Sequence, residues 1–323
     1  MLSAFPMNTI SRPSLSLLPS PSMTLLSPVV SVFSYALEPI APFTWFGLRI
    51  STLDVVAAFR LCLVLRQIRE DLYRKHVKIH GHTSVEARSF IRSASTALTV
   101  VFGGEALTCP YLMIPPSFMV SGIVPMFYTI IQAIVDTVPS VPEMFFAMEL
   151  PLSVFDGFSR TFLLCDLIPP MVTTNPSPII SASPWTLLVT SLVTANGGFF
   201  LTNLLSFMNP TPLALQTPPE LQAYGWTTAD LWCAPLVTGI YALLTHAQPF
   251  WAESHALLTE LIGMNVQGKP VEPVDAETAR AFCALLLACL FSGRTVKNFT
   301  NYFDRPVKAI QGKLKQEPKL KTQ

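Results

Sequence analysis

The sequence predicts an all-α membrane protein with seven transmembrane helices, arranged as an inverted three-plus-three repeat plus one helix. Half of the 323 residues are hydrophobic, only 13% are charged, and the mean hydropathy is +0.47, whereas soluble domains carry about 25% charged residues. Seven segments approach the roughly 20 apolar residues that a helix needs to cross a bilayer. Two glycine pairs, Gly103-Gly104 and Gly197-Gly198, lie 94 residues apart inside two of these segments.

The predicted organisation has three parts. Residues 1–45 form a Ser- and Pro-rich leader that is disordered or lies at the membrane interface, with a poorly formed eighth span between Met23 and Leu48 as the alternative. Residues 46–300 carry the seven spans, and residues 301–323 form a basic cytosolic tail. The spans are predicted at Thr52–Gln67, Arg92–Met113, Phe118–Pro139, Glu143–Ile168, Pro184–Met208, Leu231–Phe250 and Thr278–Thr295.

Basic residues set the predicted orientation. The stretch between the first two spans and the stretch after the last span hold 15 of the 21 basic residues. Seven spans put both stretches on one side of the membrane, which the positive-inside rule assigns to the cytosol. The N-terminus is then expected in the lumen of an internal membrane compartment.

The last residues suggest which compartment this is. Lys319 and Lys321 stand fifth and third from the C-terminus, a pattern that resembles the dilysine signal for retrieval to the endoplasmic reticulum. We therefore predict a location in the endoplasmic reticulum membrane, with the nuclear envelope as an alternative. The alternative interpretation of these lysines is a basic tail that contacts anionic lipid.

The glycine pairs are the first candidate functional feature. Glycine inside a helix costs about 1 kcal/mol relative to alanine, so a doubled glycine at matching places in two halves needs a reason. In membrane proteins it marks a close approach of two helices or a helix that breaks at depth. Three spans in each repeat force the two copies into opposite orientations, and such inverted repeats build transport pathways at their interface.

Charged residues inside the spans are costly and are therefore functional candidates. Asp156 and Arg160 are four residues apart, so they can pair on one helix face, as a polar lining or as a neutralised structural pair. Asp54 and Arg60 lie in the first span, and Arg60 is expected to meet Asp156, Glu105 or a free carbonyl. Glu105 follows the first glycine pair, where its carboxylate would attract cations or, if protonated, would bond across helices.

These features resemble the trimeric intracellular cation channels. The resemblance covers about residues 45–300 and is carried by Leu53-Asp54, Phe102-Gly103-Gly104 with the later Pro115-Pro116, Ser159-Arg160-Thr161, and Asn196-Gly197-Gly198 with Thr202-Asn203. It implies a homotrimer in membrane lipid with one pore in each protomer. It also implies conduction of monovalent cations, chiefly potassium, across the endoplasmic reticulum membrane to balance charge during calcium release. Asn196, Thr202 and Asn203 could then offer oxygens to a partly dehydrated potassium ion, or could form interhelical hydrogen bonds.

The sequence also departs from this family. Glu105 replaces a third glycine, and Asp156-Gly157-Phe158 stands where the family has Lys-Glu-Val. In the family that lysine and the following arginine hold a phosphoinositide, and only Arg160 is kept here, which makes phosphoinositide binding doubtful. The resemblance therefore points to a divergent member, similar to fungal ones.

Alternatives to a channel are a non-conducting membrane scaffold of the same fold and a small-solute transporter built on inverted repeats. We expect no enzyme, because the sequence contains neither His-Glu-x-x-His nor Gly-x-Ser-x-Gly. The six cysteines form no Cys-x-x-Cys pair, so we expect no metal site and no cofactor. No nucleic-acid partner is expected either.

Overall fold

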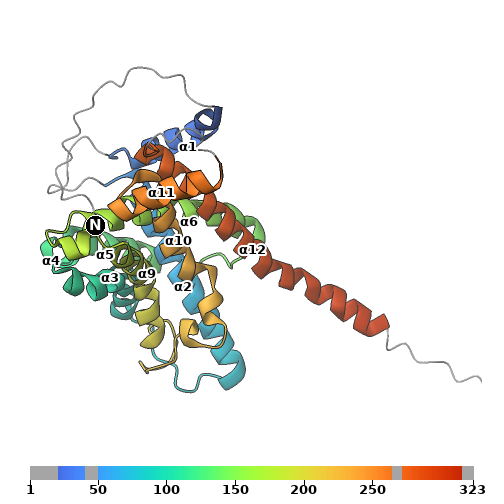
Figure 1. The fold of residues 1–323 in the computed structure, drawn as a ribbon. Helices are drawn as coiled ribbons and strands as arrows, with labels where there is room; N and C mark the ends of the chain where they lie inside the picture. The colour runs from blue at the N-terminus through green and yellow to red at the C-terminus, as the bar shows by residue number, and fades with distance from the viewer. Residues whose placement is uncertain (1–20, 41–49, 264–270, 315–323) are drawn as a thin grey trace, which may run out of the picture.

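The computed structural model describes residues 21–40, 50–263 and 271–314, and this part of the chain is mostly helical and contains no β-strand (Figure 1). The all-α class is therefore confirmed. The long helices are α1 (Pro21–Leu37), α2 (Thr52–His80), α3 (Phe90–Leu112), α5 (Ile123–Thr137), α6 (Phe146–Phe162), α9 (Pro184–Leu204), α10 (Ala229–Thr245), α11 (Pro249–Leu261) and α12 (Ala276–Leu314). The short ones are α4 (Ser117–Val120), the π-helical turn η1 (Leu163–Leu167), α7 (Ile168–Thr173), α8 (Pro178–Ser181), and the 3₁₀ turns η2 (Pro219–Leu221) and η3 (Gly225–Thr227).

Each of the seven predicted spans contains or overlaps one of the long helices, but several boundaries differ. Helix α2 begins at Thr52, as predicted, because Ser51 and Asp54 form a capping box, and it continues to His80 instead of ending at Gln67. The third span was predicted from Phe118 as one helix. The structure divides it into α4 and α5, which are separated at Ser121-Gly122.

Seven membrane crossings are not established by helix length and composition. Among the described helices, only α9 and the first part of α12, Ala276–Phe299, are long and apolar enough to cross a membrane. Helices α5 and α10 have 15 and 17 residues. At a rise of 1.5 Å per residue they fall short of the roughly 30 Å hydrocarbon core.

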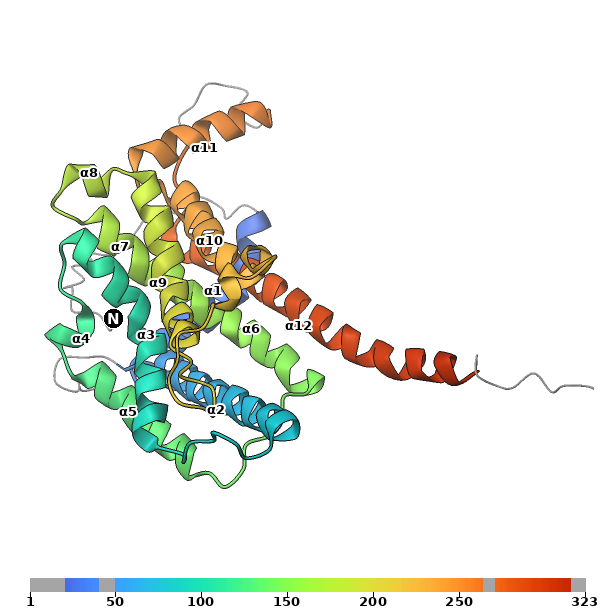
Figure 2. The ribbon, with the colours of Figure 1, turned by 90° about the horizontal axis from the view of Figure 1, so that it is seen from below.

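The connections between successive helices gather alternately at two ends of the molecule. At the first, which we call the basic end, Gln67 Nε2 donates to the Pro142 carbonyl at 2.8 Å, and the Glu86 amide donates to the Pro210 carbonyl at 2.9 Å. The first bond holds the loop after α5 against α2, and the second joins the loops after α2 and α9. The helices between the two ends therefore alternate in direction along the chain. Figure 2 shows α3 and α9 side by side, with α2 and α6 oblique to them.

The opposite end is held in the same way. Asn175 Nδ2 donates to the Leu112 carbonyl at 2.8 Å, and Gln248 Nε2 donates to the Ser181 carbonyl at 2.7 Å. These bonds join the loop after α7 to the end of α3, and the loop after α10 to the end of α8. The side chain of Asn175 is buried, as is that of Gln248, so each bond also satisfies a carbonyl in a region shielded from water.

The two terminal helices differ from prediction. Within the predicted leader, Pro21–Leu37 is a helix, so the disordered interpretation is wrong for that segment. Residues 1–20 and 41–49 lie outside the described residues. Phe33 on α1 is buried, stacks on Phe158 at 5.2 Å between ring centroids, and lies under the Arg280 guanidinium. Helix α12 continues beyond Thr295 to Leu314 and projects from the helix body (Figure 1). Lys319 and Lys321 lie outside the described residues.

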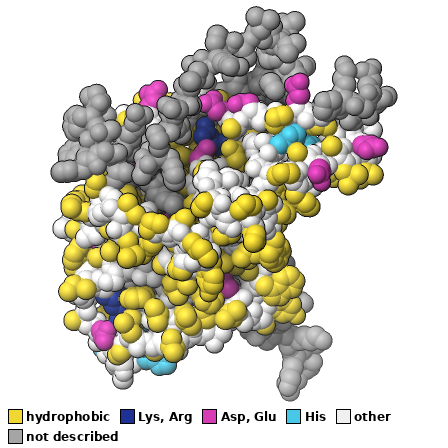
Figure 3. Space-filling view, turned by 60° about the vertical axis from the view of Figure 1, so that its left-hand side comes forward, with side chains coloured by type: hydrophobic (Ala, Val, Ile, Leu, Met, Phe, Trp, Pro, Cys, Tyr) yellow, Lys and Arg dark blue, Asp and Glu magenta, His cyan; other side chains and the backbone are white. Residues whose placement is uncertain are grey.

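One side of the molecule is largely apolar. Figure 3 shows mostly hydrophobic side chains across the middle of this face, with charged side chains near its upper and lower margins. On α5 the exposed side chains of Met126, Ile130 and Ile134 recur at every fourth residue and form an apolar stripe. A surface of this kind is compatible with contact to lipid or to another protein.

Candidate functional site: a glycine crossing beside a half-buried polar chain

Helices α3 and α9 cross in direct backbone contact at their glycine pairs. A Cβ added to Gly104 would overlap the carbonyl of Thr194 and lie 2.8 Å from its Cα. A Cβ added to Gly198 would overlap the carbonyl of Val100 and lie 2.8 Å from its Cα. The two contacts are the same after a shift of 94 residues, which takes Val100 to Thr194 and Gly104 to Gly198.

The other two glycines repeat this correspondence. A Cβ on Gly103 would lie 3.0 Å from the Gly198 Cα, and one on Gly197 would lie 2.9 Å from the Gly104 Cα. Equivalent residues of α3 and α9, related by the shift of 94 positions, therefore form the two sides of the contact. A contact of this kind has a local two-fold axis between the helices, as at an isologous interface.

Both helices remain continuous through the glycines, since α3 extends over Phe90–Leu112 and α9 over Pro184–Leu204. Of the two interpretations, the close approach of helices is right and the helix break is wrong. Glycine is needed here because it lacks a Cβ, rather than because it bends the chain. Thr108 and Thr202, also related by 94 residues, donate to the Gly104 and Gly198 carbonyls at 3.1 and 2.8 Å.

A half-buried ion-pair cluster joins α2 and α6. Arg60 Nη2 lies 2.8 Å from Glu149 Oε2 and 3.2 Å from Asp156 Oδ2, and Arg60 Nε donates to Asp156 Oδ1 at 3.3 Å. The predicted contact of Arg60 with Asp156 is therefore present. Sequence reasoning did not place Glu149 there, although a spacing of seven residues puts Glu149 and Asp156 on the same face of a helix.

Arg160 continues the polar chain from α6 to α9. Its Nη2 donates to Asn196 Oδ1 at 3.0 Å, and Asn196 Nδ2 donates to the Leu192 carbonyl at 2.8 Å and to the Leu231 carbonyl at 3.3 Å. The predicted pairing of Asp156 with Arg160 is wrong, because each of them finds its partner on a different helix. Asn196 directly precedes Gly197 in the sequence, so the polar chain reaches the glycine crossing.

Some buried atoms of this chain have no partner within the described residues. They are Arg60 Nη1, Glu149 Oε1 and Arg160 Nε. Leaving a buried polar atom unpaired costs about 1–3 kcal/mol, and such atoms usually bind ordered water. The contacts from α2 to α6 and from α6 to α9 therefore form a half-buried polar strip along α6 with free hydrogen-bonding capacity.

Glu105 and Asp54 are not brought into this chain. The Glu105 carboxylate accepts from the Ser117 amide at 2.5 Å and from Ser117 Oγ at 2.7 Å, and so holds the start of α4 against α3. Asp54 accepts from the Ser51 amide at 2.9 Å in the capping box. Asn203 lies half-buried near the end of α9.

Two further ion pairs involve α12 and were not predicted. Arg280 donates to Asp166 Oδ1 at 3.0 Å, and Arg294 bonds Asp230 at the start of α10. Asp166 belongs to the π-helical turn η1, an irregularity that is frequent at functional sites. Across the described residues, no group of three or more His, Cys, Asp or Glu side chains is arranged to hold a metal ion.

The chain was also compared with known proteins. Comparisons with protein-family models, with curated proteins and with solved structures found no match for the chain.

Proposed function

We propose that this chain is a monovalent cation channel that conducts chiefly potassium across the endoplasmic reticulum membrane and supplies counter-ion current during calcium release. One observation carries the proposal, namely the two-fold-related crossing of α3 and α9 beside a half-buried polar chain. The correspondence of contacts at a 94-residue shift is what an inverted repeat would produce. Transport pathways form at the interface of such repeats.

The alternation of loops between two ends supports the seven-span arrangement. Seven helical segments that alternate in direction would put the basic stretch Arg66–Arg92, around the loop between α2 and α3, on the same side of the membrane as the end of α12. This agrees with the positive-inside rule. The short helices α5 and α10 would then cross where the bilayer thins or where flanking residues extend to the interface. The trimer remains part of the proposal through the family resemblance.

The cation preference would arise at the contact of α2 with α6. Glu149 and Asp156 place two carboxylates around the single guanidinium of Arg60. At this contact two carboxylates exceed the one guanidinium of Arg60, while Arg160, one turn beyond Asp156 on α6, balances the charge of the chain as a whole. The carboxylates would attract cations locally. The free polar atoms of this cluster could bind the water that accompanies the ion.

A membrane scaffold that does not conduct is the second candidate. The observation that favours it is the tightness of the glycine crossing, where the α3 and α9 backbones are in contact. A pathway would therefore have to follow the polar chain beside the crossing instead of passing between the glycines.

Recording of purified protein in planar lipid bilayers under a potassium gradient tests the channel. We expect single-channel openings that reverse near the potassium equilibrium potential. Glu149→Gln combined with Asp156→Asn should reduce selectivity for cations over anions, whereas Glu143→Gln, at an exposed carboxylate paired with Arg74, should not. If no openings occur at any voltage or calcium level, the channel proposal fails and the scaffold remains.

A further inference from the structure

A cavity at the basic end is not explained by conduction. Its volume is about 600 Å³, within the range of small-ligand sites. It lies between α2, the loop after α2, the start of α3 and the loop after α9. Its lining includes four arginines and two carboxylates, namely Arg66, Arg69, Arg88, Arg92, Glu70 and Glu86.

Two of these arginines are fully engaged in holding the fold. Arg66 donates to the Glu70 carboxylate and to the carbonyls of Val135 and Pro139, and it is buried. Arg92 donates to Glu86 and to three carbonyls of the loop that follows α9, those of Ser206, Phe207 and Asn209. Both therefore form the wall of the cavity and attach neighbouring helix ends to it.

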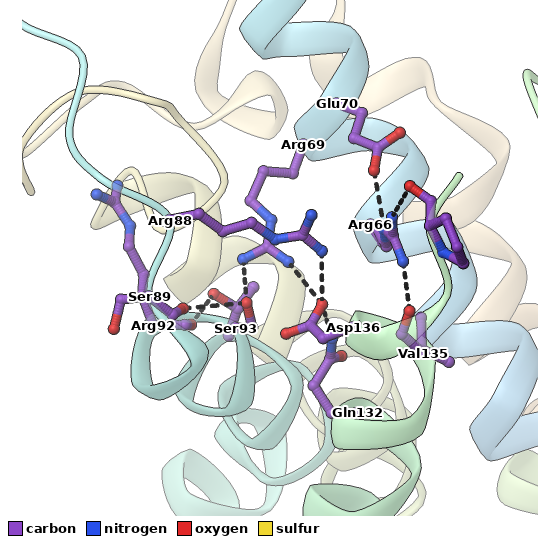
Figure 4. A network of polar contacts seen from close by, with 12 residues as sticks. Arg66, Arg69, Glu70, Arg88, Ser89, Arg92, Ser93, Gln132, Val135 and Asp136 are labelled. Atoms are coloured by element: carbon purple, nitrogen blue, oxygen red, sulfur yellow. Dashed lines mark hydrogen bonds and ion pairs between the residues drawn. The ribbon is translucent and has the colours of Figure 1, made fainter. Parts of the chain in front are cut away.

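The other two arginines share a single carboxylate. Asp136 Oδ1 lies 3.7 Å from Arg69 Nη2 and 3.0 Å from Arg88 Nη2, and the same oxygen accepts from Gln132 Nε2 at 3.1 Å. Figure 4 shows both guanidinium groups converging on Asp136. Two positive charges thus face one negative charge.

The charges around Arg69 show the same excess of positive over negative charge. Burial lowers the pKa of its guanidinium, and the charges of Arg88, Arg92 and Arg66 lower it further, while Asp136 raises it in part. A second anion in the cavity would relieve this repulsion. Guanidinium groups match phosphate oxygens in a planar, two-pronged geometry and bind them strongly.

We propose that this cavity binds a phosphate group, carried by a lipid headgroup or by a small soluble compound, with Arg69 and Arg88 as its ligands. Ser89, Tyr73 and His82 also line the cavity and could donate further hydrogen bonds. Asp136 would compete with the bound anion for the same two guanidinium groups. The proposal is independent of whether the protein conducts ions.

Titration calorimetry on the purified full-length chain in detergent tests this site. The soluble probe is sodium pyrophosphate and the lipid probe is dioctanoyl phosphatidic acid, with sodium chloride at matched ionic strength as the blank. Binding of pyrophosphate as well as of the lipid supports a site that recognises phosphate from either source. Binding of the lipid alone assigns the site to a headgroup, and binding of pyrophosphate alone assigns it to a soluble ligand.

Two arginines provide a matched pair of variants. The side chains of Arg88 and Arg74 are both 51% exposed and each pairs with one carboxylate, but Arg74 does not line the cavity. Arg88→Gln should weaken binding about tenfold or more, since a charge-assisted hydrogen bond is lost. Arg74→Gln should change it less than about twofold, as expected for an exposed charge.

A third variant is expected to change the affinity for phosphate in the opposite direction. Asp136→Asn removes the competing carboxylate and should tighten binding, whereas a purely structural role of Asp136 would weaken it. Unchanged thermal unfolding of Arg88→Gln without ligand confirms that this variant is folded. Equal binding by wild type, Arg88→Gln and Arg74→Gln, or no binding of either probe to wild type, would overturn the proposal.

Discussion

At the scale of single residues, the glycines of α3 and α9 matter for the side chain that they lack. Gly104 and Gly198 each face a carbonyl of the other helix at a distance that admits no Cβ. Small residues allow helix backbones to approach closely, and within a membrane such packing replaces the hydrophobic driving force. The spacing of these glycines in the sequence indicated the site of the crossing, but it did not distinguish contact from a helix break.

Gly104→Ala and Gly198→Ala should therefore destabilise the protein by similar amounts, each by about 2 kcal/mol or more through overpacking against backbone. Gly293→Ala on α12 is the control, because an added Cβ would have no atom within 4 Å there and alanine should gain up to about 1 kcal/mol. Unfolding in detergent, followed by tryptophan fluorescence, measures all three. Unequal losses for the two glycines would contradict the two-fold relation.

Arg60 should be the most sensitive member of the half-buried ion pairs. It is the partner of both Glu149 and Asp156, and its side chain is 9% exposed. Arg60→Gln leaves the carboxylates of Glu149 and Asp156, which are 14% and 29% exposed, without their counter-ion and should cost about 2 kcal/mol through the lost charge-assisted hydrogen bonds. Asp156→Asn should cost less, since Arg60 keeps Glu149. Equal losses for the two variants, measured by chemical unfolding, would show that the three groups do not act as one cluster.

Glu105 is a candidate that the structure places in a different setting. Its carboxylate is engaged by Ser117, so Glu105→Gln should leave the reversal potential of the channel nearly unchanged. The variant should lower stability by about 1 kcal/mol, and Ser117→Ala should do the same, because each weakens the same contact. A reversal potential that shifts with Glu105→Gln alone would instead place this carboxylate at the ion path.

At the scale of helices, apolar runs and their bounding residues predicted most elements, and tertiary contacts decided the rest. The first apolar run was predicted to begin at Thr52, and α2 begins there, after the capping box that the structure shows at Ser51 and Asp54. Asp156 and Arg160 were predicted to pair because they are one turn apart, whereas the structure gives each a partner on another helix. A four-residue spacing predicts contacts within one helix only. The contact of Asp156 with Arg60, 96 positions away in the chain, cannot be predicted from neighbouring residues.

The connection of α11 to α10 should depend on pH. His246 Nε2 and His255 Nδ1 are 2.9 Å apart, and burial, followed by the charge of His246, lowers the pKa of His255. The unfolded chain then takes up protons more readily, so this contribution to stability is present above about pH 6.5 and is lost as the pH falls below it.

The melting temperature should accordingly fall between about pH 7.5 and about pH 5.5. His255→Gln should reduce this dependence, while His80→Gln, at an exposed histidine on α2, should leave it as it is. An identical pH profile for wild type and His255→Gln would show that the histidine pair does not contribute.

At the scale of the whole molecule, successive loops lie at alternate ends of the helix bundle, which is the arrangement that seven membrane spans would require. At the basic end the loop after α2 bonds to the loop after α9, and the loop after α5 bonds to α2. At the other end the loop after α7 bonds to the end of α3, and the loop after α10 bonds to the end of α8. Composition predicted the number of segments and the side that carries the basic residues. It could not predict the arginine cavity, because Arg88 and Asp136 are 48 positions apart in the sequence.

If the helices cross a membrane, the two ends must lie on opposite sides of it. Thr83→Cys marks the basic end and Ala182→Cys the other, and both positions are exposed. In intact microsomes a membrane-impermeant maleimide should label Thr83→Cys, which the positive-inside rule places in the cytosol, and should label Ala182→Cys only after permeabilisation. The background should carry Cys289→Ser, since Cys289 is the exposed one among the described cysteines. Labelling of both positions in intact microsomes would mean that the helix bundle does not span the membrane, and neither a channel nor a transporter could then be maintained.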